Sequence, residues 1–428
     1  MGYTGCHGEI DWPCQFLNLR IFTGPVNIAP YYLLSISHCG VSKTMRVMRP
    51  DPAKVWIVHL ATVTPLGSSL QELWERLLAG QTAIRPVSRF AVANYKADVA
   101  ACVRDLAPLG EKSMIHDLLN RLIKELGPVP PNTFLITATT KAGIDNLERV
   151  QRGIQADYRD ILLSSIPETL CQRLGLKEPG INISAACASS TIAVARGAAM
   201  IASGMRDAVL VCCVDLVTEF VFSGFSSLGA LSPVPCMPFD RRRMGLTLGE
   251  GAAALLLMSP HRARKENRPP MGKIIGWGAA NDATHVTAPA RDGCGLMKAI
   301  SRALRQANLG AEQISAICAH GTGTAHNDTM ELAAFHRVFG DRKIPVFSVK
   351  GSIGHTMGAA GGIEVALGVK ALSLQVAPPT VGFSEPENGA EGMVQGVPAR
   401  FSGDYLLSTN SGFGGINAAI ILKKGVSK

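Results

Sequence analysis

Short apolar runs typical of strands alternate with helix-like segments from Val55 onward, and this alternation sets the tightest limit on the fold. The run Val55–Val58 is followed by a turn and then by apolar residues at helical spacing over 70–78. Ser69 and Glu72 match a capping box at the start of that helix. A strand followed by a crossover helix is the unit of a mostly parallel sheet, so the pattern predicts an α/β fold.

The alternation occurs twice, on either side of a charged stretch with two prolines at His261–Pro270. Before this stretch we expect strands over 55–58, 133–137, 208–214 and 252–257 and a helix over 192–203. After it we expect strands over 273–275, 314–319, 346–349, 405–409 and 418–422 and helices over 296–307, 329–339 and 363–375. In both halves a turn leads into a helix of small residues, at Ala186–Ser190 and at His355–Gly362, which predicts a duplicated fold.

We therefore divide the chain into three segments. Residues 1–47 show no regular period and lack the basic start of a secretory signal, and we treat them as an extension of unknown role. A functional start at Met45 or Met48 is the alternative to such an extension. Residues 48–263 form the N-terminal half, and residues 264–428 form the C-terminal half.

Composition excludes several classes of protein. The chain has 428 residues, of which 47% are hydrophobic and 18% charged, so it is neither disordered nor a coiled coil. The net charge is +9, but Lys and Arg are scattered, which favours an acidic partner over nucleic acid. No uninterrupted apolar stretch reaches the roughly 18 to 20 residues of a membrane span. The eleven cysteines form no C-x-x-C pair, which indicates reduced thiols and a cytoplasmic location.

Cys187 is the strongest candidate nucleophile among these cysteines. It follows Ile181–Ser184 and precedes a helix made almost wholly of small and β-branched residues. The positive end of the helix dipole is expected to lower the pKa of this thiol and favour the thiolate. A small core cysteine is the alternative, but a place at a strand-to-helix turn favours the nucleophile.

His320 follows the apolar run Ile314–Ala319 and opens a turn rich in glycine and threonine. Its imidazole should project from the carboxyl edge of the sheet, where open α/β sheets bind their ligands. A lone histidine is more often structural, and this turn favours a functional one. Asp328 with Glu331 matches a capping box for the helix that follows.

A second polar group, Lys350–His355, again follows a strand. His355 begins a helix rich in glycine and alanine, as the counterpart of the Cys187 turn. A helix N-terminus disfavours the protonated ring, so a neutral imidazole can donate a hydrogen bond to a developing oxyanion. Lys350 is alternatively a solvated strand end, but its short spacing to His355 argues against this, and Glu364 is its nearest candidate counter-ion.

The glycine-rich turn Asn410–Asn417 can aim backbone N–H groups at a ligand, and Phe413 within it can cover a pocket. By itself this turn is more typical of an ordinary hairpin. The sequence has no G-x-S-x-G elbow, Walker A loop or H-E-x-x-H motif. A serine hydrolase, a P-loop NTPase and a zinc protease therefore lack their primary evidence.

Taken together, these residues resemble the elongating β-ketoacyl-acyl carrier protein synthases of the thiolase-like superfamily. The resemblance rests on Cys187, His320, Lys350, His355 and the Phe413–Gly415 turn, with further agreement at Val63–Gly67, Pro238–Gly245 and Gly249–Ala252. It covers roughly residues 54–424. It implies a thiolase-like α/β fold with duplicated halves and a five-layered αβαβα core. It also implies an acyltransferase that extends a fatty acyl, polyketide or polyene chain by decarboxylative Claisen condensation with malonyl-acyl carrier protein.

The resemblance implies a role for each candidate. Cys187 takes the acyl chain from a phosphopantetheine thioester, and His320 and His355 stabilise the enolate formed as the malonyl carboxylate leaves. Losing CO2 beside a thioester generates a carbanion equivalent without a strong base, so charge stabilisation is what the protein must supply. Lys350 is counted as the fourth catalytic residue, paired with Glu364 behind the histidines, and Glu364 and Asp328 support the site. The N–H groups of Cys187 and Phe413 form an oxyanion hole, and Phe413 is also the gate. Thr322 and Thr324 contact the pantetheine arm. No metal and no tightly bound cofactor is implied.

Three segments depart from the family pattern. His59–Ala61 stands near the first strand, where the family usually has a glycine-rich opening. Thr139–Asp145 stands where relatives are glycine-rich, and Ser411 stands where many have a second phenylalanine. These changes lie near the expected acyl pocket and gate. The acyl chain length, and the choice between a fatty acid and a polyketide or polyene pathway, therefore stay open.

The family implies an acidic acyl carrier protein as partner and a homodimer or a heterodimer with a related subunit, with neither nucleic acid nor a membrane span. The main alternative is a non-catalytic partner of the chain-length-factor kind, but such relatives generally lack the nucleophilic cysteine. A degradative thiolase or an initiating synthase uses a second cysteine or a Cys–His–Asn set. The paired histidines favour decarboxylative elongation.

Overall fold

The computed structural model describes residues 55–425, all within one compact unit. The extension predicted over 1–47, with its candidate starts, lies outside the described residues. The strands are β1 (Trp56–Val63), β2 (Arg85–Pro86), β3 (Val99–Ala100), β4 (Phe134–Ala138), β5 (Ile181–Ile183), β6 (Ala208–Asp215), β7 (Gly251–Met258), β8 (Gly272–Asn281), β9 (Ile314–Cys318), β10 (Val346–Phe347), β11 (Val376–Ala377), β12 (Ala399–Arg400), β13 (Tyr405–Gly412) and β14 (Ile416–Lys424). The α-helices are α1 (Leu70–Leu78), α2 (Ile115–Leu126), α3 (Asp145–Gln151), α4 (Ser165–Leu174), α5 (Ser189–Ala202), α6 (Glu219–Ser227), α7 (Pro260–Lys265), α8 (Cys294–Ala307), α9 (Ala325–Phe339), α10 (Lys350–Ile353) and α11 (Ala360–Leu374).

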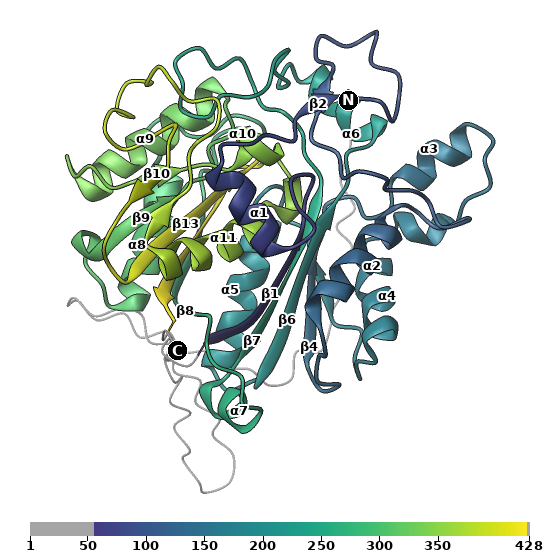
Figure 1. The fold of residues 1–428 in the computed structure, drawn as a ribbon, viewed down its shortest axis with the longest axis horizontal. Coiled ribbons are helices and arrows are strands. Elements are labelled where there is room, and N and C mark those ends of the chain that lie inside the picture. The colour runs from purple at the N-terminus through teal and green to yellow at the C-terminus, as the bar shows by residue number, and fades with distance from the viewer. Residues whose placement is uncertain (1–54, 426–428) are drawn as a thin grey trace, which may run out of the picture. The chain divides into compact units, whose positions relative to one another are not determined.

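The main sheet repeats one strand arrangement, in the order β10-β9-β13-β14-β8-β1-β7-β6-β4-β5. Each half contributes five strands to this sheet, in chain order β1, β4, β5, β6, β7 and β8, β9, β10, β13, β14. Within each set of five, the first strand pairs antiparallel with the fifth, and the fifth pairs antiparallel with the fourth. The fourth then pairs parallel with the second, and the second pairs parallel with the third. Figure 1 shows the N-terminal half in purple to teal on the right and the C-terminal half in green to yellow on the left. Because both halves have the same topology, the predicted duplication is confirmed.

The strands are buried on both faces, as β6 illustrates. Val209, Val211 and Cys213 point into a central core that also contains residues of α5 and α11. Leu210 and Cys212 point to the other side, where the core contains residues of α2 and α4. Side chains alternate between the two faces of a strand, so one apolar run fills two cores.

The C-terminal half repeats this construction on β14. Ile420 and Leu422 face the central core, whereas Ala419 and Ile421 face a core with residues of α8 and α9. The order of layers is therefore α2 and α4, the first half-sheet, α5 and α11, the second half-sheet, and α8 and α9 (Figure 1). This is the predicted five-layered αβαβα core.

Helices α5 and α11 carry small residues because they meet closely at the centre. A Cβ on Gly361 would lie 1.9 Å from Thr191 Oγ1, and one on Gly362 would lie 2.3 Å from Cys213 Sγ. Among the described residues, the segment Met357–Leu374 has the length and hydropathy of a membrane span, but 83% of it is buried inside the structure. Its apolar character is explained by this central position.

Several elements differ from their predicted bounds. Helix α9 begins at Ala325 rather than at residue 329, and Lys350 begins the short helix α10 rather than extending a strand. Helices α2, α3, α4, α6 and α7 were not predicted. The signal for α2 is present, because Ile115, Leu118, Leu119, Leu122 and Leu126 recur at helical spacing and are buried.

Candidate active site

Cys187 lies in the sharp turn between β5 and α5, directly before the helix N-cap Ala188. The turn places Ala186 in the left-handed region, with a φ of 48°. Gly412 at the end of β13 packs against this turn, and a Cβ there would lie only 3.1 Å from the Cys187 backbone nitrogen. The backbone of the 412–415 turn therefore comes directly beside the cysteine.

The thiol of Cys187 is buried, with 8% of the residue exposed. Burial raises its pKa to about 11, against the opposite effects of Lys141, Lys350 and a hydrogen bond from the Phe413 backbone N–H. The predicted lowering of this pKa is wrong, because removing water from around the sulfur outweighs the groups that stabilise the thiolate. The resting group at neutral pH is the thiol.

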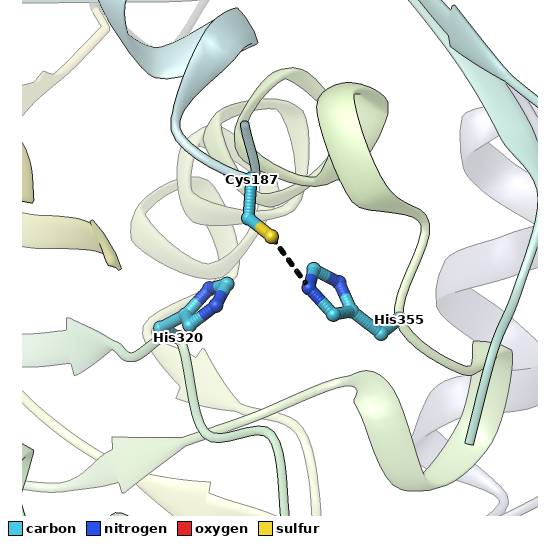
Figure 2. A group of neighbouring side chains, drawn as sticks. All are labelled: Cys187, His320 and His355. Carbon is cyan, nitrogen blue, oxygen red and sulfur yellow. Dashed lines mark hydrogen bonds between the residues drawn. The ribbon is translucent and has the colours of Figure 1, made fainter. Parts of the chain in front are cut away.

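His355 faces the thiol, with 3.1 Å between its Nε2 atom and Cys187 Sγ (Figure 2). Its Nδ1 atom accepts a hydrogen bond of 3.3 Å from the Met357 backbone N–H. The single proton of the neutral ring therefore belongs on Nε2 and points toward the sulfur. Burial, together with Lys350 and Lys141, holds the pKa of His355 well below 6.5, which agrees with the predicted neutral imidazole.

His320 is oriented in the same way by a different set of groups. Its Nδ1 atom lies 3.0 Å from the Asn410 amide nitrogen and 3.3 Å from the Lys350 ammonium, and both are donors. Its Nε2 atom therefore carries the proton. Burial, Lys350 and His355 hold the pKa of His320 well below 6.5. The two imidazole rings are 5.0 Å apart at an angle of 85° (Figure 2).

A buried polar cluster stands behind His320. The Lys350 ammonium donates to Glu364 at 2.5 Å and also to the His320 carbonyl oxygen. Asn410 donates to the other oxygen of Glu364 at 2.7 Å and accepts from the Thr191 hydroxyl. Lys350 and Glu364 are thus paired as expected. Asn410 and Thr191 were not singled out, because their partners are distant in the sequence.

The turn after His320 is held by two buried carboxylates. Glu331 accepts from the backbone N–H groups of His320 at 2.8 Å and Gly321 at 2.6 Å, and Asp328 accepts from that of Thr322 at 3.0 Å. Burial raises the pKa of Glu331 to about 7 and also raises that of Asp328. The predicted capping box of Asp328 and Glu331 is wrong, because the Thr324 side chain caps α9. Both carboxylates accept hydrogen bonds from the backbone of the His320 turn instead. Asp328 therefore supports the site through the backbone.

Two cavities meet at Cys187. One, of about 560 Å³, is lined by His320, His355, Thr322 and Thr324. The hydroxyl oxygens of the two threonines are 2.9 Å apart. The other, of about 460 Å³, extends along Thr140, Lys141 and the apolar side chains of α6. Phe413 and Phe225 line both cavities and stack at 5.8 Å between ring centres. The structure therefore brings together all the predicted site residues, with Phe413 at the junction.

The ligand atoms of Cys187, His320 and His355 all lie within 4.8 Å of one another. Such a set can hold a metal only if each ring presents a lone pair to the ion. Here the Nδ1 atoms accept hydrogen bonds, so the Nε2 atoms present N–H groups to the cavity. Two N–H donors beside a thiol are suited to bind an oxygen that gains negative charge next to a thioester.

The comparisons with known proteins agree with this geometry. Residues 137–263 match the N-terminal domain of β-ketoacyl synthases, and residues 271–384 match the C-terminal domain. A 3-oxoacyl-[acyl-carrier-protein] synthase 2 of Coxiella burnetii is 30% identical over 87% of this chain and 99% of its own length. The chain belongs to the β-ketoacyl synthase family. The ketoacyl synthase alpha subunit of the tetracenomycin polyketide synthase of Streptomyces glaucescens is also 30% identical, over 87% of this chain and 97% of its own length.

Solved structures show the same fold. The ishigamide ketosynthase/chain length factor has a TM-score of 0.79 and 28% identity, and the match covers 87% of this chain and 99% of the other. A β-ketoacyl synthase of Burkholderia phymatum STM815 has the same TM-score at 25% identity, over 87% and 99% of the two chains. The thiolase-like fold that the sequence predicted is confirmed.

Proposed function

We propose that this β-ketoacyl synthase holds an acyl group on Cys187 and lengthens it by two carbons through decarboxylative condensation with a malonyl thioester of an acyl carrier protein. One observation carries the proposal. A thiol and two neutral imidazoles lie within 4.8 Å of one another where two cavities meet. Each reacting chain can therefore enter by its own cavity and reach the same sulfur. Thr322 and Thr324 suit the cavity for a pantetheine arm, and the apolar cavity suits an acyl chain.

In the first step one thioester is exchanged for another. Cys187 Sγ attacks the acyl carbonyl carbon, the new carbon–sulfur bond forms as the pantetheine carbon–sulfur bond breaks, and the thiol proton passes to the pantetheine sulfur. The negative oxygen of the intermediate needs fixed donors. Cys187 and Phe413 line the same cavity, and the Phe413 N–H is directed at the Cys187 sulfur, which supports an oxyanion hole made by the N–H groups of these two residues.

In the second step the bond between the malonyl carboxylate and the neighbouring carbon breaks, and CO2 leaves. The electron pair of that bond stays on the thioester fragment, which becomes an enolate. The enolate carbon attacks the acyl carbonyl, the bond to Cys187 breaks, and the sulfur takes up one proton. The N–H groups on Nε2 of His320 and His355 are placed to hold the enolate oxygen. Because both rings are neutral, they donate without first losing or gaining a proton.

Lys350, Glu364 and Asn410 support this step through His320. Lys350 and Asn410 both donate toward His320 Nδ1, and Glu364 holds both donors in place. This arrangement keeps the proton of His320 on the nitrogen that faces the substrate. Lys350 and Glu364 are therefore positioning residues in the proposal.

The partners are proposed from the relatives. The Coxiella relative is named for an acyl carrier protein substrate, and ketosynthase ApeO of Xenorhabdus doucetiae, 26% identical, is known in complex with its chain length factor ApeC. We expect an acyl carrier protein as partner and a dimer with a second copy or a related subunit. A cytoplasmic location and the absence of a bound cofactor remain part of the proposal. The chain-length-factor alternative is disfavoured, because it needs neither the cysteine nor the histidine pair.

The test measures condensation and malonyl decarboxylation separately. Wild type should do both, while Cys187→Ala should decarboxylate malonyl-acyl carrier protein without condensing. His320→Ala should lose both activities by about 100- to 1000-fold, the usual effect of removing one oxyanion donor. Intact-protein mass spectrometry should find the acyl group on the wild type and on the control Cys294→Ala but not on Cys187→Ala. A wild type that neither condenses nor decarboxylates contradicts the proposal and favours the non-catalytic partner.

A further inference from the structure

Among residues 55–425, Lys141 is the one basic residue that lines the cavity proposed for the acyl chain. It shares that cavity with Cys187, and most of the remaining wall is apolar, formed by Phe220, Val221, Phe225, Leu228, Met357 and Phe413. A saturated acyl chain needs no charge in its pocket. A half-buried lysine in a mostly apolar wall can instead fix a polar or charged group of the bound chain.

Lys141 makes no direct ion pair within the described part of the chain, and the nearest carboxylate in its hydrogen-bond network, that of Asp215, is reached only through the Thr140 hydroxyl. Among residues 55–425, no carboxylate lies within salt-bridge distance of its ammonium, and its one hydrogen bond is to the Thr140 hydroxyl at 2.9 Å. That hydroxyl in turn donates to Asp215 at 2.7 Å, so Thr140 is already occupied. Two of the three ammonium donors of Lys141 are thus available to a ligand in the cavity.

The segment that carries Lys141 is held firmly on its N-terminal side. The carboxylate of Asp215, at the end of β6, accepts from Thr139 Oγ1 at 2.8 Å and from the Thr140 backbone N–H at 3.0 Å. The same carboxylate accepts from the Gly358 backbone N–H at 2.7 Å, close to His355. This contact fixes the Lys141 segment relative to the active site.

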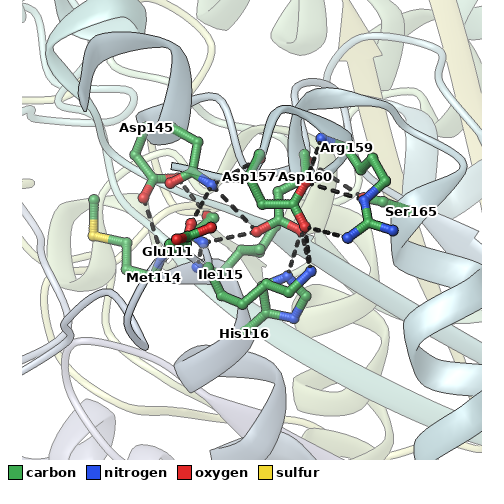
Figure 3. Close-up of polar contacts among 12 residues, drawn as sticks. Glu111, Met114, Ile115, His116, Asp145, Asp157, Arg159, Asp160 and Ser165 are labelled. Atoms are coloured by element: carbon green, nitrogen blue, oxygen red, sulfur yellow. Dashed lines mark hydrogen bonds and ion pairs between the residues drawn. The ribbon is translucent and has the colours of Figure 1, made fainter. Parts of the chain in front are cut away.

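The segment is equally fixed on its C-terminal side, in the polar network of Figure 3. Asp145 accepts from the Met114 backbone N–H at 3.0 Å and from the Ser113 hydroxyl. Gly143 donates to the Asp160 carbonyl at 2.8 Å, and Ala142 takes a left-handed φ of 47°. Lys141 is therefore presented by a rigid turn rather than by a loose loop, as a binding residue requires.

Lys141 is also close enough to the reacting atoms to affect them. It is among the charges that lower the pKa of the Cys187 thiol and of the His355 imidazole. Lys141 and Cys187 line the same cavity of about 460 Å³, so a charged group at the end of a short acyl chain on Cys187 can meet the Lys141 side chain there. Because this half-buried lysine stands in a mostly apolar wall, it suits a compact anion on such a chain.

From this geometry, and given the proposed function, we propose that Lys141 selects acyl groups that carry a carboxylate. The bound substrate would be a short ω-carboxyacyl thioester rather than an alkyl one of equal length. The carboxylate would pair with the Lys141 ammonium, while the methylene groups contact the apolar wall. The thioester exchange at Cys187 forms and breaks the same bonds as described above, and the proposal specifies only which acyl chain is transferred.

The experiment compares matched pairs of acyl-pantetheine thioesters, glutaryl against pentanoyl and adipoyl against hexanoyl. The rate constant for acylation of Cys187 is followed by intact-protein mass spectrometry. We expect wild type to prefer the carboxylated member of at least one pair by about tenfold or more, the usual value of a charged hydrogen bond. Lys141→Met should reverse that preference, and Lys141→Arg should keep most of it. Lys124→Met, which removes an exposed lysine of α2, should leave it unchanged.

Several outcomes would overturn the inference. One is a wild type that is acylated faster by the alkyl thioester than by the carboxylated one. Another is a ratio of the two acylation rate constants that is the same in Lys141→Met as in the wild type. The third is a wild type that neither kind of thioester acylates although it still decarboxylates the malonyl substrate. If Lys141 acted only on the thiol, the Met variant would slow both members of a pair equally. Decarboxylation by Cys187→Ala is measured alongside and reports on the proposed function alone. Its absence, with no acylation by any thioester, would refute the proposed function as well.

Discussion

At the scale of single residues, the sulfur of Cys187 is subject to two opposing effects. Burial raises its pKa to about 11, whereas Lys141, Lys350 and the Phe413 N–H favour the thiolate. The raised value protects the free enzyme from alkylation and oxidation at neutral pH, because the thiolate is the reactive form. The same donors are already in place when negative charge develops during attack.

This balance predicts the pH dependence of alkylation. Below its pKa the thiolate fraction grows about tenfold per pH unit, so iodoacetamide should modify Cys187 faster up to a plateau near pH 11. Lys141→Met should move the inflection to higher pH, because it removes a positive charge near the sulfur. Mass spectrometry of the peptide containing Cys187 gives the rate for this thiol alone. An inflection near neutral pH in the wild type would contradict the desolvated environment.

The buried pair of Lys350 and Glu364 gives a stability prediction. Lys350→Met leaves the buried Glu364 carboxylate with the Asn410 amide as its one donor among residues 55–425, and should lower the free energy of unfolding by about 3–5 kcal/mol. The double variant Lys350→Met with Glu364→Leu should recover most of that loss, because no unpaired charge remains. Urea unfolding of the three proteins measures this. Equal losses in the single and double variants would show that packing, rather than charge pairing, controls the effect.

At the scale of elements, the contact between α5 and α11 brings the two halves of the site together. Cys187 precedes α5, while His355 and Glu364 belong to the segment that leads into and forms α11. The helices can approach closely because Gly361 faces Thr191 across the contact. Both segments are rich in small residues, which is how they were recognised in the sequence, because larger side chains would prevent the two helices from approaching this closely.

Gly361→Ala tests this contact. Alanine is usually favoured over glycine within a helix, by about 1 kcal/mol at interior positions. At Gly361, in the first turn of α11, the Cβ of alanine would instead lie 1.9 Å from Thr191 Oγ1 and 2.7 Å from Asn410 Oδ1. We expect the free energy of unfolding to fall by about 1–3 kcal/mol, as for other overpacked cores. Gly224→Ala is the matched control, because a Cβ at that position of α6 would have no atom of the described residues within 4 Å apart from its chain neighbours and the backbone of its own helix. Thermal unfolding should show a loss for the first variant and none for the second.

At the scale of the whole molecule, the duplicated topology explains why the catalytic groups come from both halves. Equivalent strand ends meet at the central layer, so the turn before α5 supplies the thiol and the C-terminal half supplies the imidazoles (Figures 1 and 2). Cys187 and His355 are in contact although 168 residues separate them. Neither half alone contains the whole site.

The net charge of +9 gives a prediction for the carrier protein. If the partner is acidic, raising ionic strength from about 50 mM to about 500 mM should raise the KM for malonyl-acyl carrier protein severalfold, because salt screens exposed charges. The KM for malonyl-pantetheine, which lacks the carrier protein, should change little. Steady-state decarboxylation rates with both substrates provide the comparison. If the KM for malonyl-acyl carrier protein did not change with ionic strength, an electrostatic docking surface would be contradicted.

The sequence by itself determined the alternating strands and helices that identify the fold, and the chemical groups of the site, although it missed helices such as α2, α4 and α6. Strand and helix periods, the Ser69 cap and the polar residues at strand ends are local features, so Cys187, His320, Lys350 and His355 could be found from them. Their order along the chain also indicated the family, and hence the fold and the Phe413 turn.

Tertiary structure alone decided the state of those groups. The raised pKa of Cys187, the proton on Nε2 of each histidine and the carboxylates of Asp328 and Glu331 on the His320 turn depend on burial and on partners far away in the sequence. The place of Lys141 beside the thiol likewise emerges only from the fold. The reason is physical: the period of an element depends on neighbouring residues, whereas desolvation and charge pairing depend on everything that surrounds a side chain in space.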